Sequence, residues 1–243
     1  MDVDVPTSVG PGRLVVDAAA NARALLWLGH GAGGGIGAVD LAALAAALPS
    51  QGVTVVRYEQ PWRVAGRRVA ARPETLDAAW RETASVVAEL AGAAPVIAGG
   101  RSAGARVACR TAASVGAAAV VCLAFPLHPP GRPEKSRLEE LLTPAVPVLV
   151  LQGERDTFGT AAVLDGEVEG RQNVRIVAVP GADHGMRVLK ASPFTARDVR
   201  ELVTSSVARF VGELVGDPGL SAARAASPTG SSLPNARPSG SPA

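Results

Sequence analysis

Residues 94–110, "APVIAGGRSAGARVACR", decide the fold. The apolar run at 94–100 ends in glycines and predicts a buried strand, and the Ala-rich segment at 105–116 predicts a helix soon after it. Gly100, Ser102 and Gly104 thus form G-x-S-x-G at a strand-to-helix turn. Such a turn strains the serine backbone and exposes its hydroxyl, while the glycines leave room for neighbouring backbone. The pattern predicts a nucleophilic serine; its plainer interpretation is an ordinary glycine-rich turn.

The alternation of strand and helix continues through the chain. Near-continuous apolar strands separated by helices indicate the α/β class, with a mostly parallel central sheet covered by helices on both faces. Strands 13–17 and 22–29 are expected to form a pair. We expect strands at 13–17, 22–29, 53–60, 94–100, 117–125, 146–153 and 174–181, and helices at 38–52, 74–93, 105–116 and 196–215.

Length and composition suit one globular domain. The chain has 243 residues, of which 47% are hydrophobic, enough for one sizeable core. We expect this domain to span residues 1–216. Residues 217–243 contain no aromatic residue and are rich in Pro, Ser and Gly, so a disordered tail is expected there.

Charge and hydropathy favour a small-molecule partner. The 24 basic and 22 acidic residues are scattered and give a net charge of +2, so neither nucleic acid nor an anionic membrane is indicated. No stretch reaches the roughly 18 apolar residues that indicate a membrane span, and the N-terminus lacks a basic region and an apolar core. We expect a cytoplasmic monomer or small homo-oligomer.

The cysteines and histidines do not suggest a metal site. Cys109 and Cys122 lie in apolar surroundings, which predicts two buried, reduced thiols. With only three histidines, a zinc cluster is not expected. Neither a metal nor an organic cofactor is predicted.

Two downstream loops supply partners for Ser102. Asp156 follows the strand at 146–153, and His184 follows the strand at 174–181. A serine hydroxyl needs a base to take its proton, and the base needs a carboxylate to orient it. The chain order of serine, aspartate and histidine is that of α/β-hydrolases, whose functional loops lie at the carboxyl ends of parallel strands. The three residues therefore form a candidate catalytic triad.

Each role has rival residues. Glu154 lies two residues from Asp156, and Asp183 adjoins His184, but neighbouring side chains diverge in an extended loop. His30 and His128 lie in glycine- or proline-rich loops, where each is expected to fix its loop by hydrogen bonds. Asp156 and His184 are thus preferred.

The glycine loop "GHGAGGG" (29–35) permits two interpretations. Its backbone amides, with Gly31 and Ala32 as contributors, would form an oxyanion hole together with the amide of Ala103. Alternatively, Gly29, Gly31 and Gly34 match G-x-G-x-x-G for a dinucleotide, with Glu59 as the ribose-binding carboxylate. The second interpretation leaves the candidate triad unexplained.

With these residues in place, the sequence resembles the small, lidless α/β-hydrolases often labelled dienelactone-hydrolase-like, which include testis-expressed hydrolase-like proteins of animals. The resemblance covers nearly the whole chain before residue 217. It implies the eight-stranded sheet of hydrolases and a hydrolase activity. Some relatives are subunits of chromatin complexes, so the same fold can also serve as a binding scaffold. The motifs that carry it are "GHGAGG", "RYEQPWRVAGRR", "GGRSAGARVA", "CLAFPLHPPGRPEKSRLEELL", "LQGERDTFGT" and "PGADHGM".

Two positions beside the serine depart from the usual pattern of these relatives. Relatives commonly carry a lysine before the nucleophile and a bulkier residue after it, where this chain has Arg101 and Ala103. Neither departure touches the candidate triad, but each can change the shape of the pocket.

The pocket is expected to be shallow, because only 126–145 separates the strand after the elbow helix from the next strand, the place where lids are commonly inserted. An apolar wall is expected from Trp62, Phe125, Leu127, Phe158 and Met186, with His128 nearby; ordinary packing is the alternative for each. Four basic residues could favour a substrate carboxylate or form a solvated rim: Arg101, Arg132, Lys135 and Arg137.

The sequence therefore predicts a serine hydrolase of small carboxylic esters or thioesters. The alternative is a non-catalytic α/β-hydrolase scaffold that binds a protein or small ligand. A nucleotide-binding domain is the third hypothesis.

Overall fold

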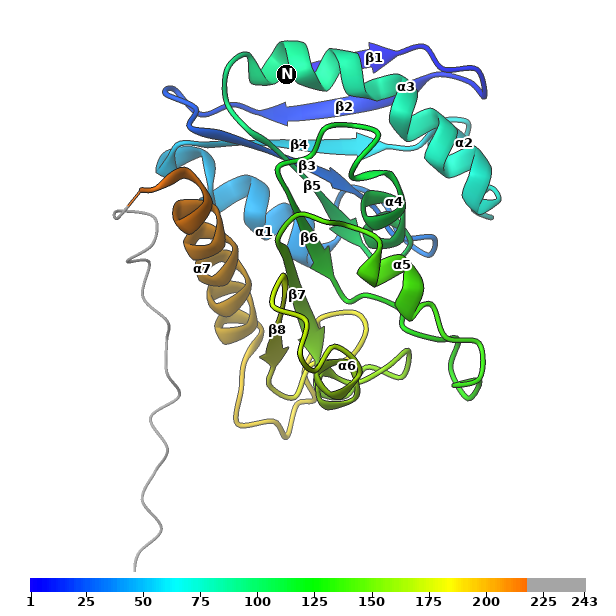
Figure 1. Cartoon of the computed structure of the whole chain (residues 1–243), viewed down its shortest axis with the longest axis vertical. Helices are drawn as coiled ribbons and strands as arrows, with labels where there is room; N and C mark the ends of the chain where they lie inside the picture. Colours follow the sequence, from blue (N-terminus) through cyan, green and yellow to red (C-terminus); the bar gives the residue numbers. More distant parts are fainter. Residues whose placement is uncertain (218–243) are drawn as a thin grey trace, which may run out of the picture.

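A single eight-stranded sheet organises residues 1–217, the part of the chain that this computed structural model describes (Figure 1). The spatial order is β1-β2-β4-β3-β5-β6-β7-β8. Strands β3 to β8 are parallel, and β1 and β2 are antiparallel at one edge. The α/β class and the eight-stranded, mostly parallel sheet are confirmed. The strands are β1 (Asp2–Val5), β2 (Gly12–Asp17), β3 (Ala24–Gly29), β4 (Val53–Glu59), β5 (Val96–Arg101), β6 (Ala119–Leu123), β7 (Val148–Gly153) and β8 (Val174–Val179).

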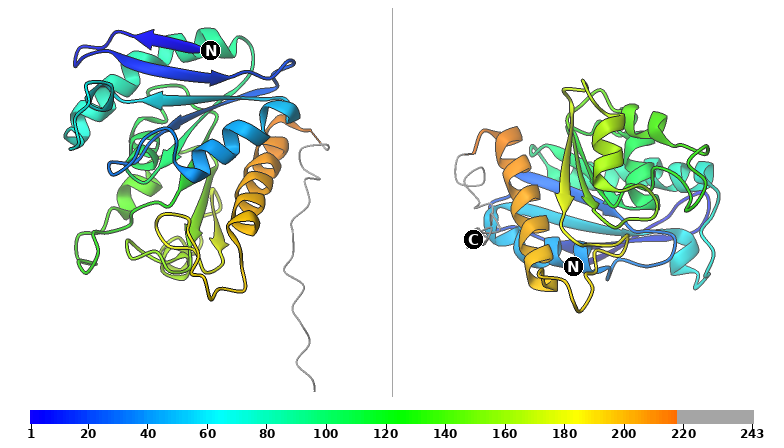
Figure 2. Two further views of the ribbon diagram at one scale, coloured as in Figure 1. Left: turned by 180° about the vertical axis from the view of Figure 1, so that it is seen from behind. Right: turned by 90° about the horizontal axis from the view of Figure 1, so that it is seen from below.

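Helices cover both faces of the sheet. Helices α1 and α7 enclose one hydrophobic core, and α3 and α4 enclose a second core on the opposite face, with α7 and α4 on opposite sides in the right-hand view of Figure 2. Only the short α5 lies between β6 and β7, so no lid domain is inserted there. The helices are α1 (Val39–Ala47), α2 (Pro61–Val64), α3 (Pro73–Ala91), α4 (Ala103–Thr111), α5 (Leu138–Leu142), α6 (Ala161–Glu167) and α7 (Ala196–Val215), with a 3₁₀ turn at Pro49–Gln51.

Helix boundaries follow local signals. The helix expected at 38–52 ends at Ala47, because Pro49 cannot continue it and begins a 3₁₀ turn instead. The helix expected at 105–116 begins two residues earlier, at Ala103, immediately after the turn. Helix α7 starts at a capping box between Thr195 and Asp198, which satisfies its first amides.

The expected pairing of strands 13–17 and 22–29 is wrong. Strand β4 lies between β2 and β3 and pairs with both. Every residue of β3 is buried, so this strand needs neighbours and helices on both sides, whereas the alternating burial of β2 suits a place near the edge. The connection between them crosses the start of β4, where the Arg23 amide donates to the Gly52 carbonyl at 2.8 Å.

The N-terminal end of the chain contains a strand that the sequence analysis did not include. Strand β1 was not predicted, although "DVDV" alternates as an edge strand does.

Cys109 and Cys122 are confirmed as free, buried thiols, with Sγ atoms 3.5 Å apart. Their contact and burial raise the pKa of Cys122. The predicted tail lies outside the described residues, except Asp217, which pairs with Arg23. Among residues 1–217, no helix combines the length and apolar character needed to cross a membrane.

Candidate active site

Ser102 occupies the sharp turn between β5 and α4. Its backbone has φ 51° and ψ −110°, a left-handed conformation that is strained for a residue with a side chain. The turn is fixed on both sides, because the Ser102 amide donates to the Leu123 carbonyl at 2.9 Å and the Ser102 carbonyl accepts from Arg106 at 3.2 Å. The strain is thus held in place by β6 and by the first turn of α4.

The glycines around Ser102 allow α4 to pack directly on β3. A Cβ on Gly100 would lie 2.5 Å from the Gly29 carbonyl oxygen, and a Cβ on Gly104 would lie 2.5 Å from the Gly29 carbonyl carbon. These obstacles are backbone atoms, which cannot move aside as a flexible side chain can. Gly29, the first glycine of the dinucleotide interpretation, therefore has a packing role next to the serine.

His184 bridges Ser102 and Asp156. Its Nε2 lies 3.0 Å from Ser102 Oγ, and its Nδ1 lies 2.8 Å from Asp156 Oδ2. The three side chains come from the carboxyl ends of β5, β7 and β8, which meet at one edge of the sheet. The His184 ring also stacks on Phe158, with ring centres 4.2 Å apart. The structure therefore brings together the three side chains that the sequence selected.

Asp156 is buried and held from two further directions. The Phe158 amide donates to its Oδ1 at 2.8 Å, and the Gln152 side-chain amide donates to its Oδ2 at 3.0 Å. Gln152 is fully buried in β7 and also donates to the carbonyl of Gly159 at 2.6 Å. Sequence reasoning missed Gln152, although a polar residue at the end of an apolar strand was a usable signal.

The rival carboxylates have other partners. Glu154 accepts a hydrogen bond from the Gly181 amide at 2.8 Å. Asp183 accepts from the amides of Gly185 and Arg187, at 2.8 and 2.9 Å, and so shapes the loop that carries His184.

The rival histidines fix loops. Buried His30 donates from Nδ1 to the Gly31 carbonyl at 2.9 Å, and its Nε2 accepts from the Gln60 amide at 3.2 Å. Burial lowers the pKa of His30, which keeps the ring neutral and suits this arrangement. Nδ1 of His128 contacts the Pro129 carbonyl at 3.0 Å.

The three residues expected to form an oxyanion hole line the pocket that contains Ser102. Gly31, Ala32 and Ala103 line the same pocket as Ser102, and a Cβ on Gly31 would lie 3.4 Å from the Ser102 Cβ. Within residues 1–217, the amides of Gly31, Ala32 and Ala103 donate to no other group. These are the donors that an oxyanion would need, and Ala103 begins α4, whose N-terminal end favours negative charge.

Residues 22–212 match the family model described as "Alpha/beta hydrolase domain". The chain belongs to this family. No protein with a curated description matches it. Among solved structures, it is similar to an alpha-beta serine hydrolase homologue from Coxiella burnetii, with 18% identity, TM-score 0.69, and coverage of 86% of this chain and 97% of that chain.

Two further structures share the fold. XC6422 from Xanthomonas campestris, described as a serine hydrolase without lid, is 21% identical with TM-score 0.67, covering 86% of this chain and 94% of its own. Thermogutta terrifontis esterase 2, in a structure phosphonylated by cyclosarin, is 17% identical with TM-score 0.61, covering 84% of this chain and 89% of its own. Both cover most of this chain, so the α/β-hydrolase fold is shared along nearly its whole described length.

The serine of this α/β-hydrolase opens into a pocket of about 540 Å³. Arg101 lines it, and so does Phe158, one of the six residues expected to form its wall. The other five do not line it, because packing uses their side chains elsewhere. Trp62, Phe125 and Leu127 are buried, His128 contacts its own loop, and Met186 lines a neighbouring pocket of about 280 Å³.

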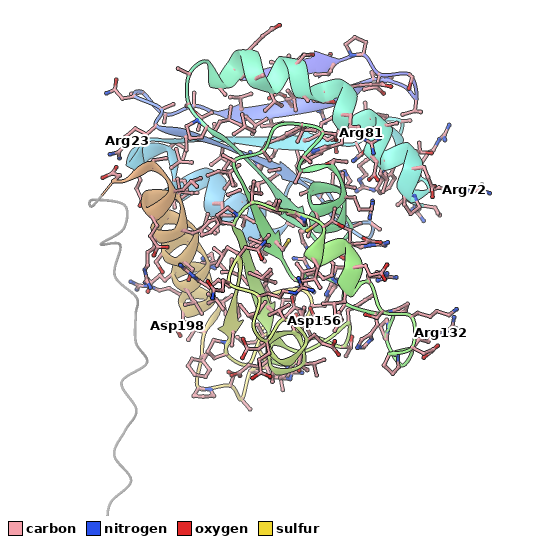
Figure 3. The ribbon with its side chains drawn as sticks, in the orientation of Figure 1. Arg23, Arg72, Arg81, Arg132, Asp156 and Asp198 are labelled. Carbon is pink, nitrogen blue, oxygen red and sulfur yellow. The ribbon has the colours of Figure 1, made fainter. Side chains whose placement is uncertain are left out.

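Of the four basic residues expected near the site, two line the pocket and two do not. Arg101 and Arg137 line the pocket, whereas Arg132 and Lys135 are exposed and do not. Figure 3 labels Arg132 at the outer end of its loop, well apart from Asp156. Two further lining residues, Arg106 and Arg187, were not predicted. Within the described residues, no group of three or more His, Cys, Asp or Glu side chains is placed to hold a metal ion.

Proposed function

We propose that this α/β-hydrolase cleaves small carboxylic esters or thioesters through an acyl-enzyme formed on Ser102. The observation that carries the proposal is the continuous contact from Ser102 Oγ to His184 Nε2 at 3.0 Å and from His184 Nδ1 to Asp156 Oδ2 at 2.8 Å. A hydroxyl next to a base that is itself oriented by a carboxylate is the arrangement that activates a serine.

In the proposed acylation step, Ser102 Oγ attacks the carbonyl carbon of the substrate while its proton moves to His184 Nε2. Asp156 accepts the hydrogen bond from Nδ1–H, which leaves Nε2 unprotonated and ready for that proton. The tetrahedral intermediate carries a negative oxygen, which the amides of Gly31, Ala32 and Ala103 would bind. Each such donor lowers the barrier by about 2.7 to 4 kcal/mol in comparable sites.

The intermediate then expels the alcohol or thiol. His184 returns its proton to the leaving group, and the acyl group remains on Ser102. A water molecule next attacks the acyl-enzyme, giving its proton to Nε2, and the carboxylic acid leaves when Ser102 recovers the proton. Deacylation needs water at the site. The His184 side chain is 21% exposed, so solvent reaches it.

The size of the pocket supports a small substrate. At about 540 Å³ it falls within the range of about 300 to 1,000 Å³ that small-molecule sites occupy. Structures with the same fold include Est1E from Butyrivibrio proteoclasticus, for which one structure has ferulic acid bound. The phosphonylated esterase from Thermogutta terrifontis supports organophosphorus compounds as probes of Ser102.

Turnover of an ester and thioester panel tests the proposal. Aryl acetates, alkyl butyrates and simple acyl thioesters are incubated with wild type and Ser102→Ala, and acid release is measured. The proposal predicts turnover by wild type that Ser102→Ala loses. A folded wild type that turns over no ester or thioester contradicts it and favours the non-catalytic scaffold. Protection by NAD(P) against thermal unfolding, together with that lack of turnover, favours the nucleotide-binding alternative.

A further inference from the structure

The charged side chains that line the pocket around Ser102 are all basic. Four arginines contribute to its walls, and neither aspartate nor glutamate does within residues 1–217: Arg101, Arg106, Arg137 and Arg187. Since buried or half-buried charges usually have partners, the question is which of these four charges the protein itself neutralises.

Two of the four arginines are neutralised. Arg101 donates to buried Asp40 at 3.1 Å and to the His184 carbonyl, so it braces the histidine loop. Arg106 forms a two-point contact with Glu140 at 2.6 and 2.7 Å. Both guanidinium groups therefore already have a carboxylate.

Glu140 has no charge left for a third partner. It also accepts from Arg110 at 2.7 Å, and Arg110 in turn makes a two-point contact with Asp77 at 2.6 and 2.8 Å. Two arginines thus face two carboxylates in this network. The ion pairs are internally balanced, and Arg137 lies beside them without belonging to them.

Arg137 and Arg187 are the arginines without a carboxylate. Arg137 is half-buried, and within residues 1–217 the one hydrogen bond of its side chain is from Nη1 to the Pro126 carbonyl at 3.1 Å. Burial and the nearby positive charge of Arg106 lower the pKa of Arg137, so its site disfavours the charge it carries. Arg187 is exposed, and within residues 1–217 its guanidinium has no hydrogen-bond or ion-pair partner.

We propose that Arg137 and Arg187 bind an anionic group of the substrate, so that the preferred substrates are esters or thioesters carrying a carboxylate. This inference rests on the proposed function and names the substrate class of the same site. The planar guanidinium of Arg137 has free N–H groups that fit the two oxygens of a carboxylate, and Arg187 adds a second positive charge at the same pocket. An anion would complete the charge balance that the protein leaves open.

The test compares substrates that differ only in charge. Monoethyl glutarate and its neutral amide, ethyl glutaramate, place the difference on the acyl group. O-acetylglycolate and O-acetylglycolamide place it on the leaving group. Each compound contains one cleavable ester, and kcat/KM is measured from product release. Wild type is expected to prefer the anion by about tenfold or more in at least one pair, the effect of one hydrogen bond to a charged group. Added salt should reduce that preference.

Three variants and a matched control assign the preference to these residues. Arg137→Gln and Arg187→Gln should each reduce the ratio of kcat/KM between anion and amide, and Arg137→Lys should retain part of it. Arg132→Gln is the control, because Arg132 is an exposed arginine of the same loop that does not line the pocket (Figure 3). It should leave the ratio unchanged. Arg187→Gln removes no contact within the described residues, so it tests the inference even if the Arg137 variants unfold.

The outcomes separate this inference from the proposed function. Hydrolysis of the neutral compounds with no preference for the anion in either pair overturns the inference and leaves the proposed function standing. A preference that persists in both glutamine variants also overturns it. Failure of folded wild type to hydrolyse any ester or thioester overturns both.

Discussion

Replacing Gly104 by alanine tests the close packing that positions the serine. The new methyl carbon would lie 2.5 Å from the Gly29 carbonyl carbon and 3.0 Å from its Cα. Carbon atoms in contact lie about 3.5 to 4.0 Å apart, so α4 and β3 must separate by about 1 Å. Overpacking of this kind costs about 1 to 3 kcal/mol, and about 2 to 4 °C of Tm is lost per kcal/mol in a domain of this size. We therefore expect Tm to fall by about 2 to 12 °C.

The same shift should slow the reaction of Ser102. Ser102 and Ala103 move with α4, whereas Gly31 and Ala32 follow β3, so the nucleophile and the Ala103 amide move away from the amides of Gly31 and Ala32. A misplacement of about 1 Å can lower a rate by about 10²-fold. Thermal unfolding and the rate of labelling by a fluorophosphonate measure the two effects. Gly37→Ala is the matched control, because a Cβ there meets nothing within 4 Å. If Gly104→Ala melts and reacts like wild type, the packing argument is wrong.

Three further predictions address the base, the ion pairs and a helix. Asp156→Asn replaces the acceptor of His184 Nδ1–H by an amide, and we expect kcat on an active ester to fall by about 10⁴-fold; a loss below tenfold would contradict the role. Burial acts to raise the pKa of Glu140, but its bonds to Arg106 and the positive charge around it lower that pKa overall. A lowered pKa stabilises the fold above the ordinary carboxyl value of about 4.3 and ceases to do so as pH falls through the folded value. Glu140→Gln should therefore lower Tm at neutral pH, with a difference that shrinks in acid; a constant difference would argue against this linkage. Gly166 lies in α6, and a Cβ there would meet nothing within 4 Å. Because alanine favours a helix more than glycine does, Gly166→Ala should raise Tm by about 1 to 4 °C. No rise would mean that the glycine has an unrecognised role.

The arrangement of Ser102, Asp156 and His184 could be anticipated because it depends on topology. Each residue directly follows an apolar run, and parallel strands place their carboxyl ends at one edge of the sheet. Chain order then selects the roles. No knowledge of side-chain packing is needed for that step. Asp156 was preferred over Asp183 on a separate ground, because the side chains of neighbours such as Asp183 and His184 diverge in an extended loop.

The pocket wall could not be anticipated in the same way. Whether Phe125 faces a substrate or the core depends on the direction of its side chain after β6, and the structure buries it completely. Arg106 and Arg187 were missed because spacing alone does not show which face of a helix or loop borders the pocket. The neighbours of β3 were also missed, although its six consecutive apolar or glycine residues indicate a central strand.

Covalent labelling of Ser102 shows whether its hydroxyl is an activated nucleophile. Purified wild type, Ser102→Ala and His184→Ala are incubated with a fluorophosphonate, and intact mass is followed over time. We expect a single adduct on wild type, none on Ser102→Ala, and strongly slowed labelling of His184→Ala, with all three proteins folded by circular dichroism. A folded wild type that forms no adduct, or an adduct that persists in Ser102→Ala, would show that Ser102 is not the nucleophile.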